Sequence, residues 1–292
     1  MTFDQHEQQH DREREPQRDP KSALERQQER QRQDEPQPKP QHQHPDIWGI
    51  VLAAGASKRM GRQKLTLPLE DGTPMVRRVL DEAAASSLSE VVVVVRADDE
   101  DVQRATQPVT EPVTKPETQP EPETDTETEP ETNPNPDTEP ANRPWMQVRN
   151  WDAADGMSTS LRAGIATAEA GGADAVVILL ADQPGITRFH INAVVEKYGA
   201  TRDLIVQASY NGAPSHPTLF DRKLFRELLE VTGDEGGRSV VQRHQNDRCL
   251  VSLEGEVPVD LDTPESYKAW LQQSHSDGPG SRLGGTLKSP RR

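Results

Sequence analysis

The sequence predicts an α/β domain built on a mostly parallel, doubly wound (Rossmann-like) sheet. Residues 47–53, 91–95 and 175–180 are continuous apolar runs, as expected for parallel strands that are buried on both faces. Helical patterns alternate with these runs, which is typical of a parallel sheet covered on both sides. Ligands in such folds bind beyond the carboxyl ends of the strands. We therefore expect the loops after residues 53 and 181 and around residue 261 to share one crevice.

The remaining elements follow from local patterns along the chain. Pro74 begins a helix that reaches residue 86 and has its apolar residues on one face. Ser158, Thr187 and Thr263 are expected to cap helices. The other predicted strands are residues 145–148, 204–208, 249–253 and 257–261, and the other predicted helices are 158–168, 187–198, 221–230, 237–244 and 263–271.

The chain has 292 residues, and three of its segments have too few apolar residues to fold on their own. We interpret residues 1–45 as a disordered polar tail and residues 274–292 as a Ser/Gly/Arg tail. Residues 103–141 repeat Thr, Glu and Pro, which predicts a disordered acidic insertion within a single domain at 46–273. The insertion is either a tolerated expansion of a surface loop or an acidic segment that binds a partner.

Charge and cysteine content exclude several classes of protein. The formal net charge is -15, of which the insertion contributes -8 and the N-terminal tail -2. No basic face is expected, so we predict no nucleic-acid partner. Cys249 is the only cysteine, so no intrachain disulfide can form. No run approaches the ~18 apolar residues of a membrane span, and no signal peptide is evident. We expect no membrane partner and a cytoplasmic location.

A loop rich in glycine and basic residues follows the first strand. Gly55 and Gly61 allow tight turns, and free backbone N–H groups in such a loop bind anions. Arg59 and Lys64 add cations that can neutralise a triphosphate. The loop is neither a Walker A motif nor a Gly-x-Gly-x-x-Gly motif. An ordinary basic surface loop is the alternative, which the position at a strand end disfavours.

Two aspartates are candidate metal ligands. Asp182 lies just after the end of the strand at 175–180, and Asp262 precedes the last helix. One or two carboxylates together with phosphates and water form the usual Mg²⁺ site. The alternatives are a helix-capping role for Asp182 and helix initiation for Asp262.

These motifs together resemble the MobA-like nucleotidyltransferases, and within them the molybdenum cofactor cytidylyltransferases. Residues 52–64 match the opening motif Leu-Ala-Ala-Gly-x-Ser-x-Arg-Met-Gly-x-x-Lys at every fixed position. Further blocks are similar to the family at 150–161, 182–184, 215–217, 233–238 and 260–266. In three blocks the sequence departs from the family pattern: Ser215 and Gly237 replace a Gly and an Ala, and Ser266 replaces the final Asp.

The resemblance implies a nucleotide-diphospho-sugar transferase-like fold and a set of site residues. Arg59, Lys64 and Asp182 would be catalytic, and Asp182 and Asp262 would bind Mg²⁺. His216, Asp234 and Arg238 would contact the acceptor, although a packed loop histidine is an equal reading for His216. The nucleotide would contact Leu52, Ala53, Ala54, Gly55, Ser57, Arg59, Gly61, Lys64, Ser158 and Ser160.

The activity implied by this resemblance is transfer of CMP from CTP to the terminal phosphate of molybdopterin, with release of pyrophosphate. In the family, Ala at the position of Ala54 goes with CTP and Gly goes with GTP. The alternatives are guanylyl transfer, transfer to another phosphorylated acceptor, and a non-catalytic accessory protein that inserts the molybdenum cofactor. A molybdenum hydroxylase is a possible protein partner in either case.

Overall fold

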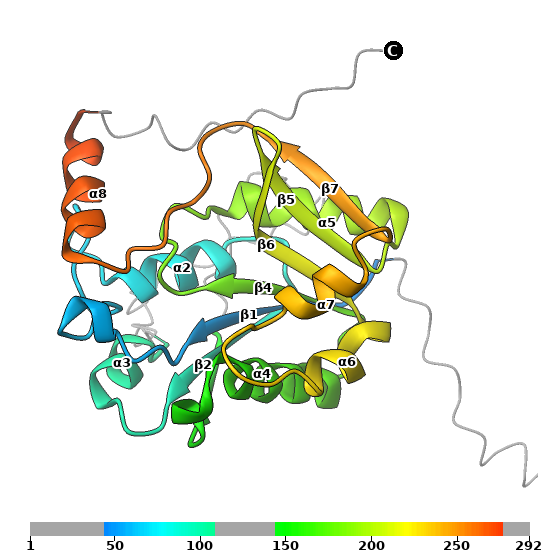
Figure 1. Cartoon of the computed structure of the whole chain (residues 1–292), viewed down its shortest axis with the longest axis horizontal. Helices are drawn as coiled ribbons and strands as arrows, with labels where there is room; N and C mark the ends of the chain where they lie inside the picture. Colours follow the sequence, from blue (N-terminus) through cyan, green and yellow to red (C-terminus); the bar gives the residue numbers. More distant parts are fainter. Residues whose placement is uncertain (1–43, 109–143, 277–292) are drawn as a thin grey trace, which may run out of the picture. The chain divides into compact units, whose positions relative to one another are not determined.

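One sheet of seven strands forms the centre of the part of the chain that the structure describes, residues 44–108 and 144–276 (Figure 1). The structure is a computed structural model, and all of these residues lie in one unit of the chain. The strand order is β3-β2-β1-β4-β6-β5-β7. The strands are β1 Ile47–Ala53, β2 Glu90–Arg96, β3 Met146–Asn150, β4 Ala175–Leu180, β5 Ile205–Tyr210, β6 Ala213–Asp221 and β7 Arg248–Leu253. All neighbours pair in parallel except β6, which is antiparallel to β4 and β5. The prediction of a mostly parallel α/β sheet is confirmed.

Helices cover both faces of this sheet (Figure 1). Alternate residues of β2 belong to two separate cores: Val91, Val93 and Val95 to one, and Val92 and Val94 to the other. The first core includes residues of α2 Met75–Ala84, α3 Glu100–Ala105, α5 Arg188–Thr201 and α8 Pro264–Ser276. The second includes residues of α4 Met157–Gly171, α6 Phe225–Leu229 and α7 Arg238–Arg243. This two-sided burial explains why the central strands are apolar runs without alternation.

The order of the strands reverses direction at β1. The chain runs outward from β1 to β2 and β3, and then returns to the other side of β1 to form β4. The loops that leave β1 and β4 therefore start side by side at the carboxyl edge of the sheet. Such a switch point is where open α/β sheets bind ligands.

A close approach of α4 to β1 depends on glycine. A Cβ atom at Gly164 would lie 2.5 Å from Cγ2 of Ile50, which is far inside normal contact distance. The missing side chain lets the helix lie directly on the strand, and it thereby fixes the start of α4 relative to the carboxyl edge of the sheet.

A hairpin joins β5 to β6, and the sequence analysis did not identify β6 as a strand. Asn211 and Gly212 both have positive φ, at 51° and 87°. Asn-Gly is the strongest short-range signal for a two-residue hairpin turn, so this strand could have been predicted.

The acidic insertion begins later than the predicted residue 103, because α3 covers Glu100–Ala105. Gln103 is buried, and its side-chain amide donates to the carbonyl oxygens of Arg96 and Ala97, each at 3.0 Å. Across the insertion, the indole N–H of Trp145 donates to the carbonyl of Thr106 at 2.6 Å. Residues 109–143 lie outside the described residues, and so do residues 1–43 and 277–292 of the tails predicted at 1–45 and 274–292.

Further boundaries also differ from the predictions; for example, the helix predicted at 221–230 is α6, which covers only Phe225–Leu229. Residues 257–261 are irregular rather than a strand, since Val257 and Val259 are 40% and 51% exposed and Pro258 has no N–H to pair. Helix α4 begins at Met157 after Gly156, so Ser158 lies inside its first turn and is not its N-cap. Helix α8 continues to Ser276, past the predicted start of the C-terminal tail at residue 274.

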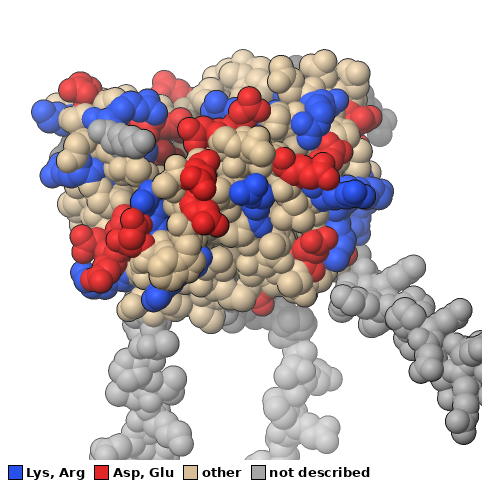
Figure 2. Space-filling view, turned by 60° about the horizontal axis from the view of Figure 1, so that its bottom comes forward, with Lys and Arg blue, Asp and Glu red and all other residues tan. Residues whose placement is uncertain are grey.

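One face of the described residues has a mixed charge. Acidic and basic side chains are interspersed on the face shown in Figure 2. That face therefore has no continuous basic area of the kind that binds nucleic acid. Among the described helices, we find none with the length and apolar character needed to span a membrane.

Candidate active site

The loop after β1 folds back on itself so that Lys64 points into the carboxyl edge of the sheet. Ala53 and Ala54 are buried, whereas Gly55 is exposed and nothing lies within 4 Å of where its Cβ would be. Two left-handed residues, Ser57 at φ 49° and Gly61 at φ 66°, flank a short 3-10 helix at Lys58–Met60. The predicted loop is therefore present, with an open backbone stretch beginning at Gly55.

Lys64 is the centre of a charge cluster at the switch point. Its ammonium lies 2.6 Å from a carboxylate oxygen of Asp182 and also contacts a carboxylate oxygen of Asp262. The other oxygen of Asp262 lies 2.7 Å from the guanidinium of Arg59. The Lys64 side chain is 8% exposed, whereas that of Arg59 is 73% exposed. The structure thus brings together the four charged residues that the sequence singled out for phosphate and metal chemistry.

The protonation of Lys64 follows from this environment. Burial alone would lower the pKa of its ammonium, but the carboxylates of Asp182 and Asp262 outweigh burial and raise the pKa above its ordinary value. Lys64 is therefore fully charged at neutral pH. The positive charges of Lys64 and Arg59 balance the negative charges of the two aspartates. A bound triphosphate would therefore need a further cation to offset its own charge.

Hydrogen bonds join the two loops that carry the aspartates. The backbone N–H of Leu261 donates to the carbonyl of Asp182 at 3.0 Å, and the side-chain amide of Gln183 donates to Asp260 at 2.7 Å. Burial, followed by repulsion from Asp182 and Asp262, raises the pKa of the Asp260 carboxyl. These contacts tie together the two loops that place Asp182 and Asp262 at the Lys64 ammonium.

The start of α4 lies beside the acceptor loop predicted at residues 233–238. Asp234 accepts a hydrogen bond from the backbone N–H of Met157 at 3.1 Å, and Gly233 accepts one from Ser158 N–H at 3.0 Å. Gly156 has φ 112°, and a Cβ there would lie 2.7 Å from the carbonyl oxygen of Gly233. Asp234 therefore holds the N-terminus of α4 in this structure, a role that the sequence analysis did not assign to it.

The predicted nucleotide contacts Ser158 and Ser160 are buried, at 1% and 4% exposure. The side-chain amide of Asn150 donates to the hydroxyls of Thr159 and Ser160, at 2.8 and 2.9 Å. Asn150 thus joins the end of β3 to α4. It was visible in the sequence only as part of the family motif. Contact between these serines and a nucleotide stays a prediction.

His216 lies on β6 and is electrostatically coupled to the charge cluster. Its Nδ1 is 3.2 Å from the carbonyl oxygen of Ile178. Burial is the main cause that lowers the pKa of His216 to about 4. The positive charge of Arg238 lowers it further, whereas the hydrogen bond to the carbonyl of Ile178 and the negative charge of Asp182 oppose this. His216 is therefore neutral at physiological pH and lies within electrostatic range of both Asp182 and Arg238.

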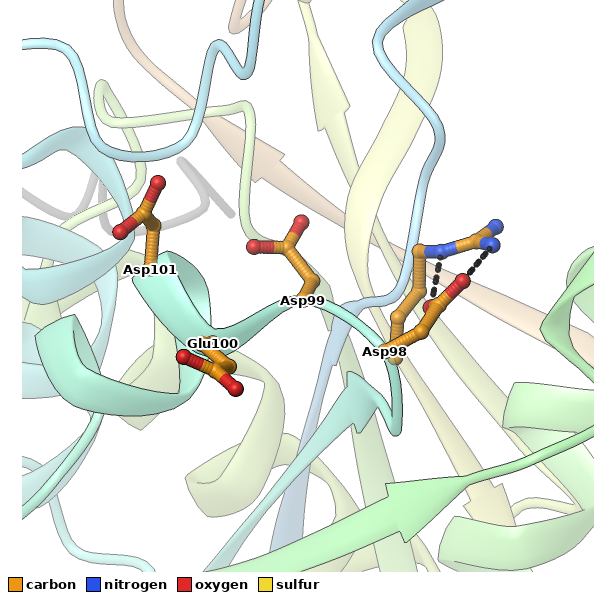
Figure 3. Close-up of a pocket in the computed structure, with 5 residues that line it drawn as sticks. Asp98, Asp99, Glu100 and Asp101 are labelled. Atoms are coloured by element: carbon orange, nitrogen blue, oxygen red, sulfur yellow. Dashed lines mark hydrogen bonds and ion pairs between the residues drawn. The ribbon is translucent and has the colours of Figure 1, made fainter.

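An open depression of about 420 Å³ lies at the end of β2 and is lined by Arg96 and residues 98–101 (Figure 3). Asp98 pairs with Arg96 there, at 3.0 Å. Four carboxylates against one guanidinium would repel a triphosphate. The charges of this depression therefore suit a triphosphate less well than those of Lys64 and Arg59.

The fold and the charge cluster define the class of protein as a nucleotidyltransferase: a doubly wound sheet whose switch point carries a glycine-containing basic loop and two aspartates. The model of the MobA-like NTP transferase domain matches residues 49–124 and 131–249. The chain belongs to this family.

Individual relatives agree with this assignment. The purine catabolism protein PucB of Bacillus subtilis (strain 168) is 32% identical over 227 residues, covering 76% of this chain and 95% of PucB. The nicotine blue oxidoreductase of Paenarthrobacter nicotinovorans is 26% identical over 231 residues, covering 76% of this chain and 94% of that protein. The names of these relatives describe different activities, so the family relationship leaves the substrates to be tested.

A solved structure shows the same fold. Rv0371c from Mycobacterium tuberculosis H37Rv aligns with a TM-score of 0.59 at 23% identity, covering 78% of this chain and 98% of that one. A second crystal structure of that protein is a complex with manganese. Among the described residues of this chain, no group of three or more His, Cys, Asp or Glu side chains is arranged to hold a metal. Asp182 and Asp262 remain the pair that could do so.

Proposed function

We propose that this protein transfers CMP from CTP to the terminal phosphate of molybdopterin and releases pyrophosphate. The observation that carries the proposal is the cluster of Lys64, Arg59, Asp182 and Asp262 at the switch point of the sheet. Membership in the MobA-like family and 32% identity to PucB support the nucleotidyltransferase class. The choice of CTP as the nucleotide and of molybdopterin as the acceptor rests on the family motifs in the sequence.

The carboxylate pair fits a bound Mg²⁺. Both aspartates contact the same ammonium, so their oxygens converge on one small volume, and hard carboxylate oxygens are the ligands that Mg²⁺ prefers. When bound, Mg²⁺ would neutralise phosphate charge. The manganese complex of Rv0371c is consistent with a divalent ion in a protein of this fold.

The residues of this chain then act by positioning and charge. An oxygen of the acceptor phosphate attacks the α-phosphorus of CTP, and the bond from that phosphorus to the bridging oxygen breaks, so that pyrophosphate leaves. Lys64 and Arg59 stabilise the negative charge that develops on the phosphate oxygens. The acceptor phosphate is already ionised and needs no general base, which agrees with the weak basicity of His216, whose pKa is lowered to about 4 by burial.

Ala54 is proposed to select the nucleotide base. It is 7% exposed and directly precedes the open backbone at Gly55. A glycine at this position would leave more room beside the base. We therefore expect Ala54→Gly to shift the preference from CTP toward GTP, measured as the ratio of kcat/KM for the two nucleotides.

The acceptor is proposed to lie near His216 on β6 and Arg238 at the start of α7. The charges of Arg238 and of Asp182 in the cluster both act on His216, and Asp234 holds the neighbouring start of α4. Transfer to a different phosphorylated acceptor would use the same cluster with other contacts here. Docking onto a molybdenum hydroxylase is compatible with either acceptor.

The test is pyrophosphate release with Mg²⁺ and molybdopterin, with CTP, GTP, ATP and UTP compared. Asp182→Asn keeps the shape of the side chain and removes its charge, and the exposed Asp247→Asn is the matched control. Release with CTP that is lost only in the Asp182 variant is the expected result. Release with GTP alone would assign guanylyl transfer, and no release with any nucleotide would contradict the proposal.

A further inference from the structure

A set of side-chain hydrogen bonds joins the Lys64 loop to helix α3. The side-chain carbonyl oxygen of Gln63 accepts from the Ser57 hydroxyl at 2.9 Å and from the backbone N–H of Leu65 at 3.1 Å. The backbone N–H of Lys64 donates to the Ser57 hydroxyl at 3.2 Å. The amide NH₂ of Gln63 in turn donates to Asp99 at 2.5 Å. The Gln63 side chain thus bonds to Ser57 and Leu65 within the loop and to Asp99 outside it.

Asp99 is a fixed anchor rather than a mobile surface carboxylate. Its second oxygen accepts from the backbone N–H of Val102 at 3.0 Å and so caps α3. Val102 is buried in the core, and Gln103 ties the same helix to the end of β2. In Figure 3 the Asp99 carboxylate stands apart from the Asp98 side chain and its pairing with arginine.

The loop needs such an anchor because its backbone is held in an unfavourable conformation. Ser57 has φ 49°, a left-handed conformation that costs a non-glycine residue free energy unless its surroundings enforce it. The contacts of Asp182 and Asp262 fix only the far end of the long Lys64 side chain. The backbone that carries this side chain is held by Ser57 and Gln63.

We infer that Gln63 and Asp99 are positioning residues that hold the Lys64 loop in its nucleotide-binding conformation. This inference rests on the proposed function in one respect, namely that the loop binds a nucleotide. Neither residue contacts the charge cluster among the described contacts, so their effect passes through the backbone of the loop.

The donors and acceptors require an amide at position 63 and a carboxylate at position 99. Gln63 presents its oxygen to two donors, so its NH₂ must face Asp99. In Asp99→Asn, the one remaining oxygen is needed for the α3 cap, and the new NH₂ would face that of Gln63. In Gln63→Glu, two carboxylates would face each other. Combining both changes restores every donor–acceptor pair, because the carboxylate at 63 then accepts from the amide at 99.

The experiment compares the wild type, Gln63→Glu, Asp99→Asn and the double variant. We expect the backbone amides of Lys64 and Leu65 to exchange hydrogen about tenfold faster in each single variant, and Mg²⁺-CTP affinity to fall about tenfold. In the double variant, both values recover by at least about threefold relative to each single variant. The comparison with Asp99→Asn isolates geometry from charge, because the double variant carries one more carboxylate than Asp99→Asn, and that charge by itself would weaken CTP binding. Asp101→Asn, in the exposed pair with Arg104, is the control and should change neither value.

Unchanged amide exchange in the single variants would overturn the inference, and so would a double variant no better than Asp99→Asn. Altered exchange with unchanged CTP affinity would also overturn it, because the bridge would then be a structural contact alone. A wild-type protein that binds no CTP would instead contradict the proposed function, and amide exchange would still decide whether Gln63 and Asp99 hold the loop.

Discussion

Removing the charge of Lys64 should affect stability and activity by amounts that the structure allows us to estimate. In Lys64→Met, the carboxylates of Asp182 and Asp262 lose the ammonium that they share. That ammonium lies 2.6 Å from the Asp182 carboxylate. Breaking a buried ion pair in this way typically costs about 3–5 kcal/mol. Because the two carboxylates are 21% and 26% exposed, water offsets part of the loss. We therefore expect the free energy of unfolding to fall by about 2–3 kcal/mol.

The same change should lower pyrophosphate release by at least about 100-fold, the effect of removing one preorganised charge from a phosphate site. Urea denaturation and initial rates measure the two effects, with the exposed Lys223→Met as the matched control. Adding Asp262→Asn to Lys64→Met should recover part of the lost stability, because it removes an unpaired carboxylate. A Lys64→Met variant with wild-type stability and wild-type rate would refute the reasoning.

Two further predictions concern the acceptor side of the site. Burial lowers the pKa of His216 from its ordinary value of 6.5 to about 4 in the folded protein. As pH falls, the unfolded chain therefore binds a proton at this side chain before the folded chain does. The contribution of neutral His216 to stability is complete above pH 6.5 and is lost as pH falls toward about 4. Denaturation at pH 8, 6, 5 and 4 should show the wild type losing stability relative to His216→Gln over that range, and a constant difference would contradict this. Gly156→Ala should destabilise the protein by about 2–3 kcal/mol, since its φ is 112° and the added Cβ would meet a carbonyl oxygen at 2.7 Å. Gly199→Ala, a helical position with nothing within 4 Å, is the matched control and should be neutral or stabilising in the same urea titration.

The sequence predicted the centre of the fold well because burial leaves a direct record in composition. The strands at Ile47–Ala53 and Ala175–Leu180 have the predicted bounds, since a strand buried on both faces must be apolar throughout. The same logic failed at residues 257–261, where two valines are exposed and the chain is irregular. A short run of β-branched residues does not by itself say whether a neighbouring strand is available for pairing.

The polar parts of the structure were harder to predict. Helix α3 was assigned in part to the acidic insertion, because Gln103 and its neighbours resemble the polar sequence that follows. It is nevertheless ordered, since the Gln103 amide bonds to two backbone carbonyls. Such a contact depends on the tertiary structure and has no signature in local composition.

The candidate site was also predictable only in part. Charge and position at strand ends were enough to select Arg59, Lys64, Asp182 and Asp262, which the structure brings together. The hydrogen bonds from Gln63 to Asp99 and from Gln183 to Asp260 join residues that are far apart in the chain. Without the fold, nothing in the sequence pairs these residues.

The central claim is that the Lys64 cluster binds a nucleoside triphosphate together with a divalent cation. The most direct test is calorimetric titration of CTP into the wild type and into Asp262→Asn, with and without Mg²⁺, and with Asp247→Asn as control. We predict Mg²⁺-dependent binding by the wild type and the control, and binding weakened at least about tenfold in Asp262→Asn. Binding of equal strength without Mg²⁺, or undiminished binding by Asp262→Asn, would contradict the account.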